Sequence, residues 1–248
     1  ASSYAMRELG VPFAGLFGAC STMAEGLALG AALCEGGAAR NLLAMASSHF
    51  CAAERQFRTP LSYGAVRTPT AQWTATAAGC CLLQPQGEGV GIAAATFGRV
   101  QDYQVKDINN MGAAMAPAAA STLLHYFKDT GTEPQEFDCI YTGDLGQVGS
   151  QLLRELLAAE GLLIKNHVDC GCILFDANEQ SVKSGGSGPG CCAAVLCGHI
   201  LPRLRRGSQK RVLFTATGAL MSQTTFLQKE TIPAVAHLVE LRAPEKEK

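Results

Sequence analysis

The sequence lacks an apolar stretch long enough to span a bilayer. A transmembrane helix needs about 20 predominantly apolar residues, and the strongest candidate, residues 13–33, is interrupted by Glu25 and by several glycines. The chain also lacks a signal peptide and begins with Ala1 rather than with Met. We therefore expect a cytoplasmic-type soluble chain without a membrane anchor of its own, whose natural N-terminus is missing.

An excess of charge of one sign is also absent. The 248 residues include 20 Lys and Arg and 21 Asp and Glu, which gives a formal net charge of −1. Two short basic clusters, residues 203–206 and 210–211, are typical of helix ends. Because a nucleic-acid-binding domain normally presents a basic patch or stripe, the sequence predicts no nucleic acid partner.

The eleven cysteines lack the spacing of a metal centre. No two of them are separated by two residues, as they are in zinc and dithiol redox motifs. Cys170 and Cys172 have no second pair to complete a metal site, and the five histidines are scattered along the chain. We predict free thiols in a reducing compartment, no metal site and no cofactor.

Alternating strand and helix patterns are abundant in the chain, which is 48% apolar and contains 27 glycines. The predicted strands are residues 13–17, 42–46, 73–83, 90–100, 137–142, 212–217 and 235–241. The predicted helices are residues 20–34, 111–128, 146–160 and 191–205. This alternation predicts an α/β fold in which sheets are buried between helices.

The order of these elements indicates an internal duplication. Divided near residues 84–89, the chain gives two halves, residues 1–86 and 87–248, and each half ends in two successive strands after its last helix. The second half has one strand–helix unit more than the first. We infer that the N-terminal part of the first half is missing, and that residues 1–10 are the tail of a helix.

Cys20 is the most informative single residue. It follows the apolar run 13–17 and opens the predicted helix at residues 20–34. The positive end of a helix dipole stabilises a thiolate, so this position predicts a nucleophile or an anion site. The alternative is a small buried core residue, since free cysteines are commonly buried.

Several motifs resemble those of the thiolase-like condensing enzymes: Met111–Ala118, Phe137–Asp144 and Gly185–Gly190. Within that superfamily the chain resembles the stage V sporulation protein AD family of spore-forming bacteria, through residues 18–25, 47–51, 54–58, 69–74, 109–118, 142–146 and 216–220. The resemblance covers essentially the whole chain. It implies a thiolase-like layered fold of duplicated βαβαββ halves, in the order α/β/α/β/α.

Condensing enzymes need a base and oxyanion donors beside the thiol. The resemblance puts the family's two His or Asn positions at Gly143 and at about Gly186 or Ser187, and none of these offers an imidazole. Acid–base catalysis worth about a hundred- to ten-thousand-fold per group is then lost. The resemblance therefore implies a protein that is not an enzyme and has no catalytic residues.

The same resemblance implies a ligand, dipicolinic acid (pyridine-2,6-dicarboxylate), with or without calcium, which the protein helps to take up into the forespore and to release in germination. A flat aromatic dianion suits a helix N-terminus, guanidinium groups and apolar or aromatic walls. The residues predicted to bind it are Cys20, Ser21, His49, Phe50, Arg55, Arg58, Asp144, Gly186 and Ser187. Further implications are a homodimer, other stage V sporulation membrane proteins as partners, and a peripheral position at the forespore or spore inner membrane.

Two other functions stay open. The chain could be a condensing or acyl-transfer enzyme that uses Cys20 on coenzyme A thioesters, or an adaptor of a membrane transport complex without its own ligand. Asp144 also has two interpretations, a base or a structural hydrogen-bonding group. Arg55 and Arg58 could instead form ion pairs with Glu54 or with a partner subunit.

Overall fold

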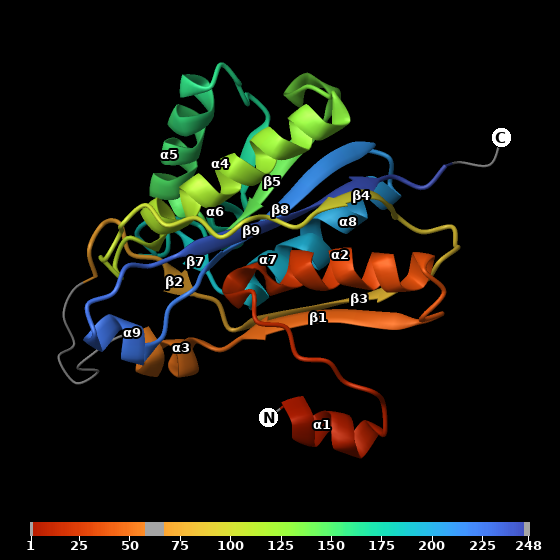
Figure 1. The fold of residues 1–248 in the computed structure, drawn as a ribbon, viewed down its shortest axis with the longest axis horizontal. Coiled ribbons are helices and arrows are strands. Elements are labelled where there is room, and N and C mark those ends of the chain that lie inside the picture. The colour runs from red at the N-terminus through yellow and green to blue at the C-terminus, as the bar shows by residue number, and fades with distance from the viewer. Residues whose placement is uncertain (1, 58–66, 246–248) are drawn as a thin grey trace.

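The computed structural model describes residues 2–57 and 67–245, which fold into alternating layers of sheet and helix (Figure 1). The first layer is a two-stranded antiparallel sheet, formed by β1 (Leu42–Ser48) and β3 (Ala77–Leu83). Within the described residues, no helix is both long and apolar enough to cross a membrane.

Helices pack on both faces of the next sheet. Helices α2 (Thr22–Glu35) and α7 (Pro189–Val195) lie between the two-stranded sheet and a five-stranded one, and α4 (Met111–Thr130) and α5 (Gly146–Ala159) cover the far side (Figure 1). One apolar core fills the first of these interfaces and a second core fills the other. The layers confirm the predicted α/β fold, with the five-stranded sheet covered by helices on both faces and the two-stranded sheet covered on one.

The five-stranded sheet has the order β4-β9-β8-β5-β6. Its strands are β4 (Gly91–Thr96), β9 (Ala234–Arg242), β8 (Arg211–Ala219), β5 (Cys139–Gly143) and β6 (His167–Asp169). Strands β5, β6 and β8 are parallel, whereas β9 runs antiparallel to both β8 and β4. The side chains of β5 are buried throughout, as expected for a parallel strand covered on both faces.

The structure contains the same helix–strand–strand unit twice. Helix α2 is followed by the antiparallel pair β1 and β3, and α8 (Leu201–Arg205) is followed by the antiparallel pair β8 and β9. The chain passes from one sheet to the other between β3 and β4. These are the successive strands from which the sequence predicted a duplication.

The remaining elements are short. They are α1 (Ser2–Leu9), the turn η1 (Ala19–Ser21), α3 (Phe50–Phe57), β2 (Trp73–Thr74), η3 (Pro134–Glu136), α6 (Cys170–Leu174), β7 (Gly186–Ser187), the π turn η4 (Leu196–Ile200) and α9 (Gln223–Leu227). Helix α1 confirms the helix predicted within residues 1–10. In Figure 1 it lies apart from the layered body.

The predicted strand at residues 13–17 is wrong. This segment has no regular structure, and the side chains of Phe13 and Phe17 are 55% and 90% exposed. A strand is made by its hydrogen-bonded neighbour, and none of the described strands pairs with this segment. The apolar run therefore has the composition of a strand, but it lacks the neighbouring strand with which it would have to pair.

Two other predicted strands are shorter than expected. Residues 73–83 are divided into β2 and β3, because β2 pairs with β7 while β3 pairs with β1. Residues 90–100 are strand only over β4, which ends before Gly98. A Cβ at Gly98 would lie 1.8 Å from the carbonyl oxygen of Ala236, so the backbone here packs too closely for a side chain.

The outer face of the two-stranded sheet is apolar and exposed. Leu43 pairs with Leu82, and Met45 pairs with Cys80 in the next position of the same face. The three large side chains are 58%, 58% and 49% exposed for Leu43, Leu82 and Met45. Within the described residues, β1 hydrogen-bonds along one edge only.

Gly79 marks a close approach of β3 to α7. A Cβ at this position would lie 2.5 Å from the carbonyl oxygen of Ala193, whereas a Cβ at Gly87 would meet nothing within 4 Å. We expect Gly79→Ala to lower the free energy of unfolding by about 1–3 kcal/mol through overpacking. Denaturant unfolding measures this change, with Gly87→Ala as the matched control. Equal stability of the two variants would contradict the tight contact.

Candidate functional site

Cys20 lies in the turn η1, immediately before helix α2. Ala19 in this turn has φ 50°, an unusual conformation for a residue other than glycine. The turn packs against β8, where a Cβ on Gly218 would lie 2.2 Å from the carbonyl oxygen of Gly18. The start of α2 is thus seated on the five-stranded sheet.

The hydrogen-bond donors that were predicted to bind a ligand carboxylate instead form hydrogen bonds within this turn. The backbone N–H and the hydroxyl of Ser21 both donate to the carbonyl oxygen of Gly18, at 3.0 and 2.6 Å. The N–H of Gly18 donates to Oε2 of Glu25 at 3.0 Å. Ser21 is also fully buried, so its predicted role in ligand binding is not supported by its contacts.

The prediction of a Cys20 thiolate is wrong. The residue as a whole is half-buried, but its thiol is within hydrogen-bonding reach of the fully buried Asp144. Burial raises the pKa of Cys20 well above its ordinary value, and the nearby Asp144 and Cys192 raise it further. These effects outweigh the helix start, which acts only within the first turn, and the thiol is therefore protonated at neutral pH.

The side chain of Asp144 connects the turn at Gly188 with strand β8. Its Oδ2 accepts a hydrogen bond from the N–H of Gly188 at 2.9 Å, and its Oδ1 accepts one from the hydroxyl of Thr217 at 3.1 Å. Burial raises the pKa of Asp144 to about 8, although these two donors and Cys20 act in the opposite direction. At neutral pH this carboxyl group is mainly uncharged.

Asp169 holds the turn that carries Asp144. Its carboxylate accepts hydrogen bonds from the hydroxyl of Thr142 at 2.7 Å and from the N–H groups of Leu145, Gly146 and Gly171 at 2.9 Å each. Burial raises the pKa of Asp169, but the four donors limit it to about 6. The ionised form therefore predominates at neutral pH.

A side chain at Gly143 or at Gly186, two of the positions that the resemblance assigned to catalytic groups, would be crowded by its neighbours. A Cβ at Gly143 would lie 2.9 Å from that of Cys192 and 3.0 Å from Cα of Ala216. A Cβ at Gly186 would lie 3.0 Å from the ring of Phe175. Both glycines are buried by neighbouring elements.

Gly186 and Ser187 form strand β7, which pairs with β2. The carbonyl oxygen of Ser187 accepts the N–H of Ala75 at 2.9 Å. The next residue, Gly188, has φ 101° and gives its N–H to Asp144. The backbone of this turn is thus engaged in sheet pairing and in holding Asp144.

A cluster of aromatic rings and a guanidinium group adjoins this turn. The rings of Phe50 and Trp73 are stacked, with centroids 4.9 Å apart and an interplanar angle of 17°. The guanidinium carbon of Arg67 lies 4.0 Å from the centroid of Trp73, and Nη1 donates to the carbonyl oxygen of Gln72 at 2.9 Å. The Gln72 side-chain amide donates to the carbonyl oxygen of Asp144, which connects the cluster to the Cys20 site.

Sequence reasoning predicted Phe50 but missed Trp73, Arg67, Asp169 and Thr217. Trp73 carried a signal, because it is the single tryptophan of the chain. Thr217 lies on β8 and is fully buried, and its sequence neighbourhood carried no signal of a site.

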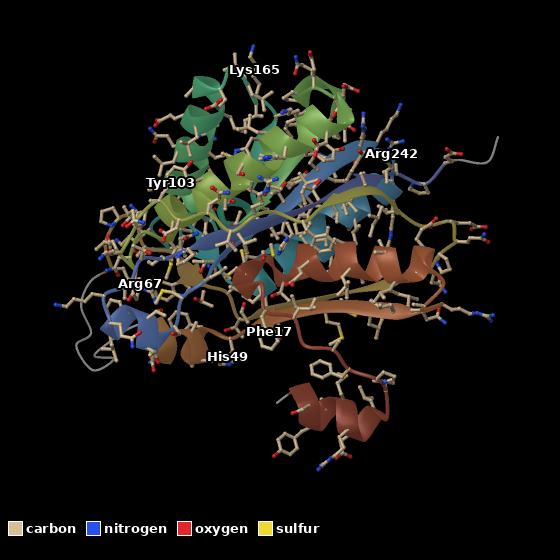
Figure 2. All side chains as sticks on the ribbon, in the orientation of Figure 1. Phe17, His49, Arg67, Tyr103, Lys165 and Arg242 are labelled. Carbon is tan, nitrogen blue, oxygen red and sulfur yellow. The ribbon has the colours of Figure 1, made fainter. Side chains whose placement is uncertain are left out.

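The other predicted site residues lie around α3. His49 is exposed, as Figure 2 shows, and its carbonyl oxygen accepts the N–H groups of Ala52 and Ala53 at the start of the helix. Arg55 belongs to α3 rather than to the expected loop, and its side chain lies outside the described part. Arg58 lies outside the described residues altogether.

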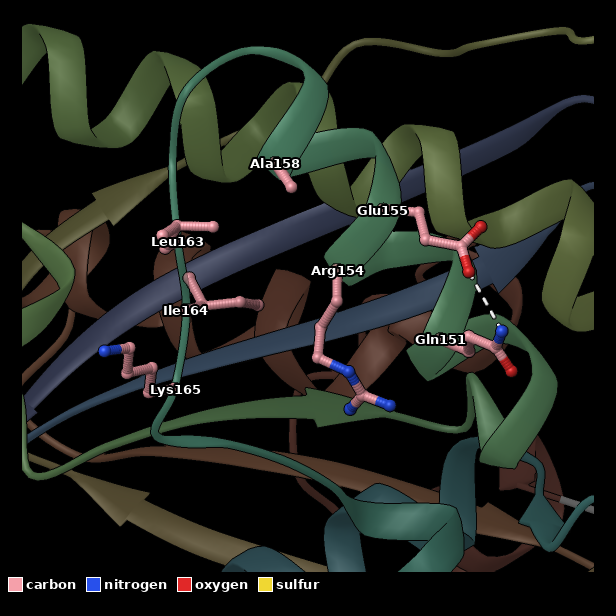
Figure 3. Close-up of a pocket in the computed structure, with 7 residues that line it drawn as sticks. All are labelled: Gln151, Arg154, Glu155, Ala158, Leu163, Ile164 and Lys165. Atoms are coloured by element: carbon pink, nitrogen blue, oxygen red, sulfur yellow. Dashed lines mark hydrogen bonds between the residues drawn. The ribbon is translucent and has the colours of Figure 1, made fainter.

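A surface pocket of about 340 Å³ lies on the outer side of α5 (Figure 3). Its lining residues are Gln151, Arg154, Glu155, Ala158, Leu163, Ile164 and Lys165. Gln151 donates to Glu155 across one helical turn at 2.9 Å. None of these residues contacts Cys20 or Asp144, so the pocket is separate from the site.

The raised pKa of Asp144 predicts how stability depends on pH. An unfolded Asp releases its proton near pH 4, whereas folded Asp144 holds it to about pH 8. The folded state therefore binds more protons in this window, and the free energy of unfolding falls as pH rises, at up to about 1.4 kcal/mol per pH unit. Between pH 6 and 8, above the pKa of Asp169, Asp144→Asn should flatten this slope.

Chemical denaturation at several pH values measures this slope. Asp129→Asn, at an exposed position near the end of α4, is the control and should keep the slope of the unmodified chain. Parallel curves for all three proteins would mean that Asp144 is ionised throughout.

Solved structures that share the fold are condensing enzymes. A tetronic acid condensing enzyme matches with a TM-score of 0.58 at 15% identity, covering 97% of this chain and 72% of its own. Cerulenin-bound OleA of Xanthomonas campestris gives 0.59 at 14%, covering 97% and 67%. The 3-oxoacyl-(acyl carrier protein) synthase III of Pseudomonas aeruginosa gives 0.56 at 14%, covering 98% and 72%. At these identities the likeness establishes a thiolase-like fold and nothing more.

Sequence comparison defines the family. The family model for stage V sporulation protein AD matches residues 1–242. The stage V sporulation protein AD of Bacillus subtilis (strain 168) is 44% identical over 237 residues, which cover 95% of this chain and 70% of the relative. The chain therefore belongs to the stage V sporulation protein AD family.

Proposed function

We propose that this chain is a non-catalytic, thiolase-fold protein that binds dipicolinic acid and takes part in its uptake into the forespore and its release in germination. The observation that carries the proposal is the cluster of Arg67, Trp73 and Phe50 beside the Cys20–Asp144 pair. Stacked rings next to a guanidinium group suit a flat aromatic ring that carries carboxylates.

The charge state of the site supports an anionic ligand. A carboxylate at position 144 would repel a dianion, but burial raises the pKa of Asp144 to about 8, so at neutral pH the group is mainly uncharged. Arg67 supplies positive charge in the adjoining cluster, where its guanidinium group lies over Trp73.

The absence of catalysis is part of the proposal. A protonated thiol is a weak nucleophile, and burial raises the pKa of Cys20 well above its ordinary value. The positions of Gly143 and Gly186 leave no space for an imidazole without repacking. The name of the Bacillus subtilis relative, a sporulation protein, agrees with a role other than condensation.

The wider setting is also proposed. We infer a homodimer that works with other stage V sporulation membrane proteins and lies peripherally at the forespore or spore inner membrane. The support is the family itself, whose name refers to sporulation. Calcium could accompany dipicolinic acid as the counter-ion of its two carboxylates.

Calorimetric titration of dipicolinic acid into the full chain tests the proposal. We expect saturable binding that Arg67→Ala weakens by more than tenfold, since a hydrogen bond to a charged group contributes about 1.5–3 kcal/mol. Trp73→Ala should also weaken binding, because it removes the ring on which the ligand would stack. Arg154→Ala, which removes a guanidinium group from the separate pocket on α5, should bind normally. Pyridine-2-carboxylate, which has one carboxylate, should bind more weakly.

Each variant needs a thermal unfolding curve, so that lost binding is distinguished from lost structure. Absence of binding by a folded, unmodified chain would overturn the proposal and favour an adaptor without its own ligand. Binding that survives Arg67→Ala and Trp73→Ala would place the ligand elsewhere on the chain.

A second function, acyl transfer, is favoured by one observation. Cys20 lies in η1, just before α2, beside the carboxyl group of Asp144 and on a fold shared with condensing enzymes. If Cys20 forms an acyl-enzyme, incubation with acetyl-coenzyme A should add an acetyl group that intact mass spectrometry detects and that Cys20→Ser abolishes. We expect no adduct, and its appearance would contradict the non-catalytic proposal.

A further inference from the structure

Two cysteines from different layers of the fold face each other. Cys81 lies on β3 and Cys197 lies in the π turn η4, and their sulfur atoms are 3.9 Å apart. The sulfur of Cys197 also lies 3.7 Å from the carbonyl oxygen of Cys80. The two backbones are therefore adjacent, since β3 packs directly against η4.

This separation is within reach of a covalent bond. The sulfur atoms of a disulfide are about 2.0 Å apart, so Cys81 and Cys197 need to approach by roughly 2 Å, which small side-chain rotations can supply. Cys197 is followed by Gly198, where a Cβ would meet nothing within 4 Å, so the π turn has room to adjust.

The neighbouring Cys80 provides a control for the direction of the Cys81 side chain. Side chains alternate along a strand, and Cys80 points to the exposed outer face opposite Met45, whereas Cys81 packs against the core beneath the sheet. Two adjacent thiols thus differ in direction. The geometry allows a bond from Cys197 to the inward residue and disfavours one to the outward residue.

Cys197 also has the reactivity that oxidation needs. A hydrogen bond from the Cys81 thiol lowers the pKa of Cys197 below its ordinary value, and the positive charge of Arg205 acts in the same direction. The thiolate is the form that attacks an oxidant. The residue is half-exposed, so a small oxidant can reach it.

We propose that Cys81 and Cys197 form a reversible disulfide when the protein meets a hydroperoxide. The Cys197 thiolate attacks one oxygen of hydrogen peroxide, the O–O bond breaks, and the departing hydroxide takes up a proton to leave water and a sulfenic acid. The Cys81 thiol then attacks that sulfur, forms the S–S bond and releases a second water. Two thiols are oxidised, one peroxide is reduced, and a low-molecular-weight thiol reverses the bond by exchange.

The bond would tie the two-stranded sheet to the helix that separates it from the five-stranded sheet. In the sequence, Cys81 precedes the point between β3 and β4 at which the chain moves to the five-stranded sheet, and Cys197 follows it. The cross-link therefore restrains the two-stranded sheet against the helical layer that contains η4. Oxidised protein should resist denaturant at higher concentration than reduced protein, because the closed loop limits the unfolded chain.

Peptide mapping without reduction tests the proposal. The unmodified chain and the variants Cys80→Ser, Cys81→Ser and Cys197→Ser are exposed to hydrogen peroxide, alkylated and digested. We expect a linked peptide pair, two hydrogens lighter than its free components, in the unmodified chain and in Cys80→Ser only. A link that persists in Cys81→Ser, or no link in the unmodified chain, would overturn the proposal.

A second measurement does not depend on oxidation. Iodoacetamide labelling of Cys197 should reach half of its maximal rate at a lower pH than an ordinary cysteine does, and Cys81→Ala should move this midpoint to higher pH because it removes the donor thiol. Cys80→Ala should leave the midpoint unchanged. A midpoint that does not respond to Cys81→Ala would show that the two sulfurs do not interact.

Discussion

The carboxylate of Asp169 accepts four hydrogen bonds, and three of them come from backbone N–H groups. Two of these N–H groups belong to the turn between β5 and α5, where Asp144 and Gly146 have φ values of 59° and 65°. A buried ionised carboxylate needs such donors to offset its lost hydration. The turn needs the carboxylate in return, because its conformation is unfavourable for Asp144.

Asp144 in this turn contacts three other parts of the site. The Asp144 side chain accepts from Gly188, its carbonyl oxygen accepts from Gln72, and its carboxyl group meets the thiol of Cys20. A fold shared with condensing enzymes thus places an uncharged acid where a reactive thiol would need a base. The same lack of charge is what allows an anionic ligand nearby, so lost nucleophilicity and proposed binding have one physical cause.

The sequence was sufficient where structure is local. Apolar runs at residues 42–46 and 212–217 predicted strands, and the start of α2 was predicted within two residues. It failed where the outcome depends on distant partners. Residues 13–17 lack a neighbouring strand, the pKa of Cys20 is governed by Asp144, and the cluster at Trp73 depends on pairing between β2 and β7. No local pattern encodes these contacts.

The open face of the two-stranded sheet has a consequence for how the chain behaves in solution. Leu43, Met45 and Leu82 form a flat apolar surface beside an edge of β1 that bonds to no described strand. Such an edge can pair with a further strand. Covering the apolar surface is also favourable, because it removes apolar side chains from water. We therefore expect aggregation at high protein concentration to begin at this face, independently of the chemistry at Cys20.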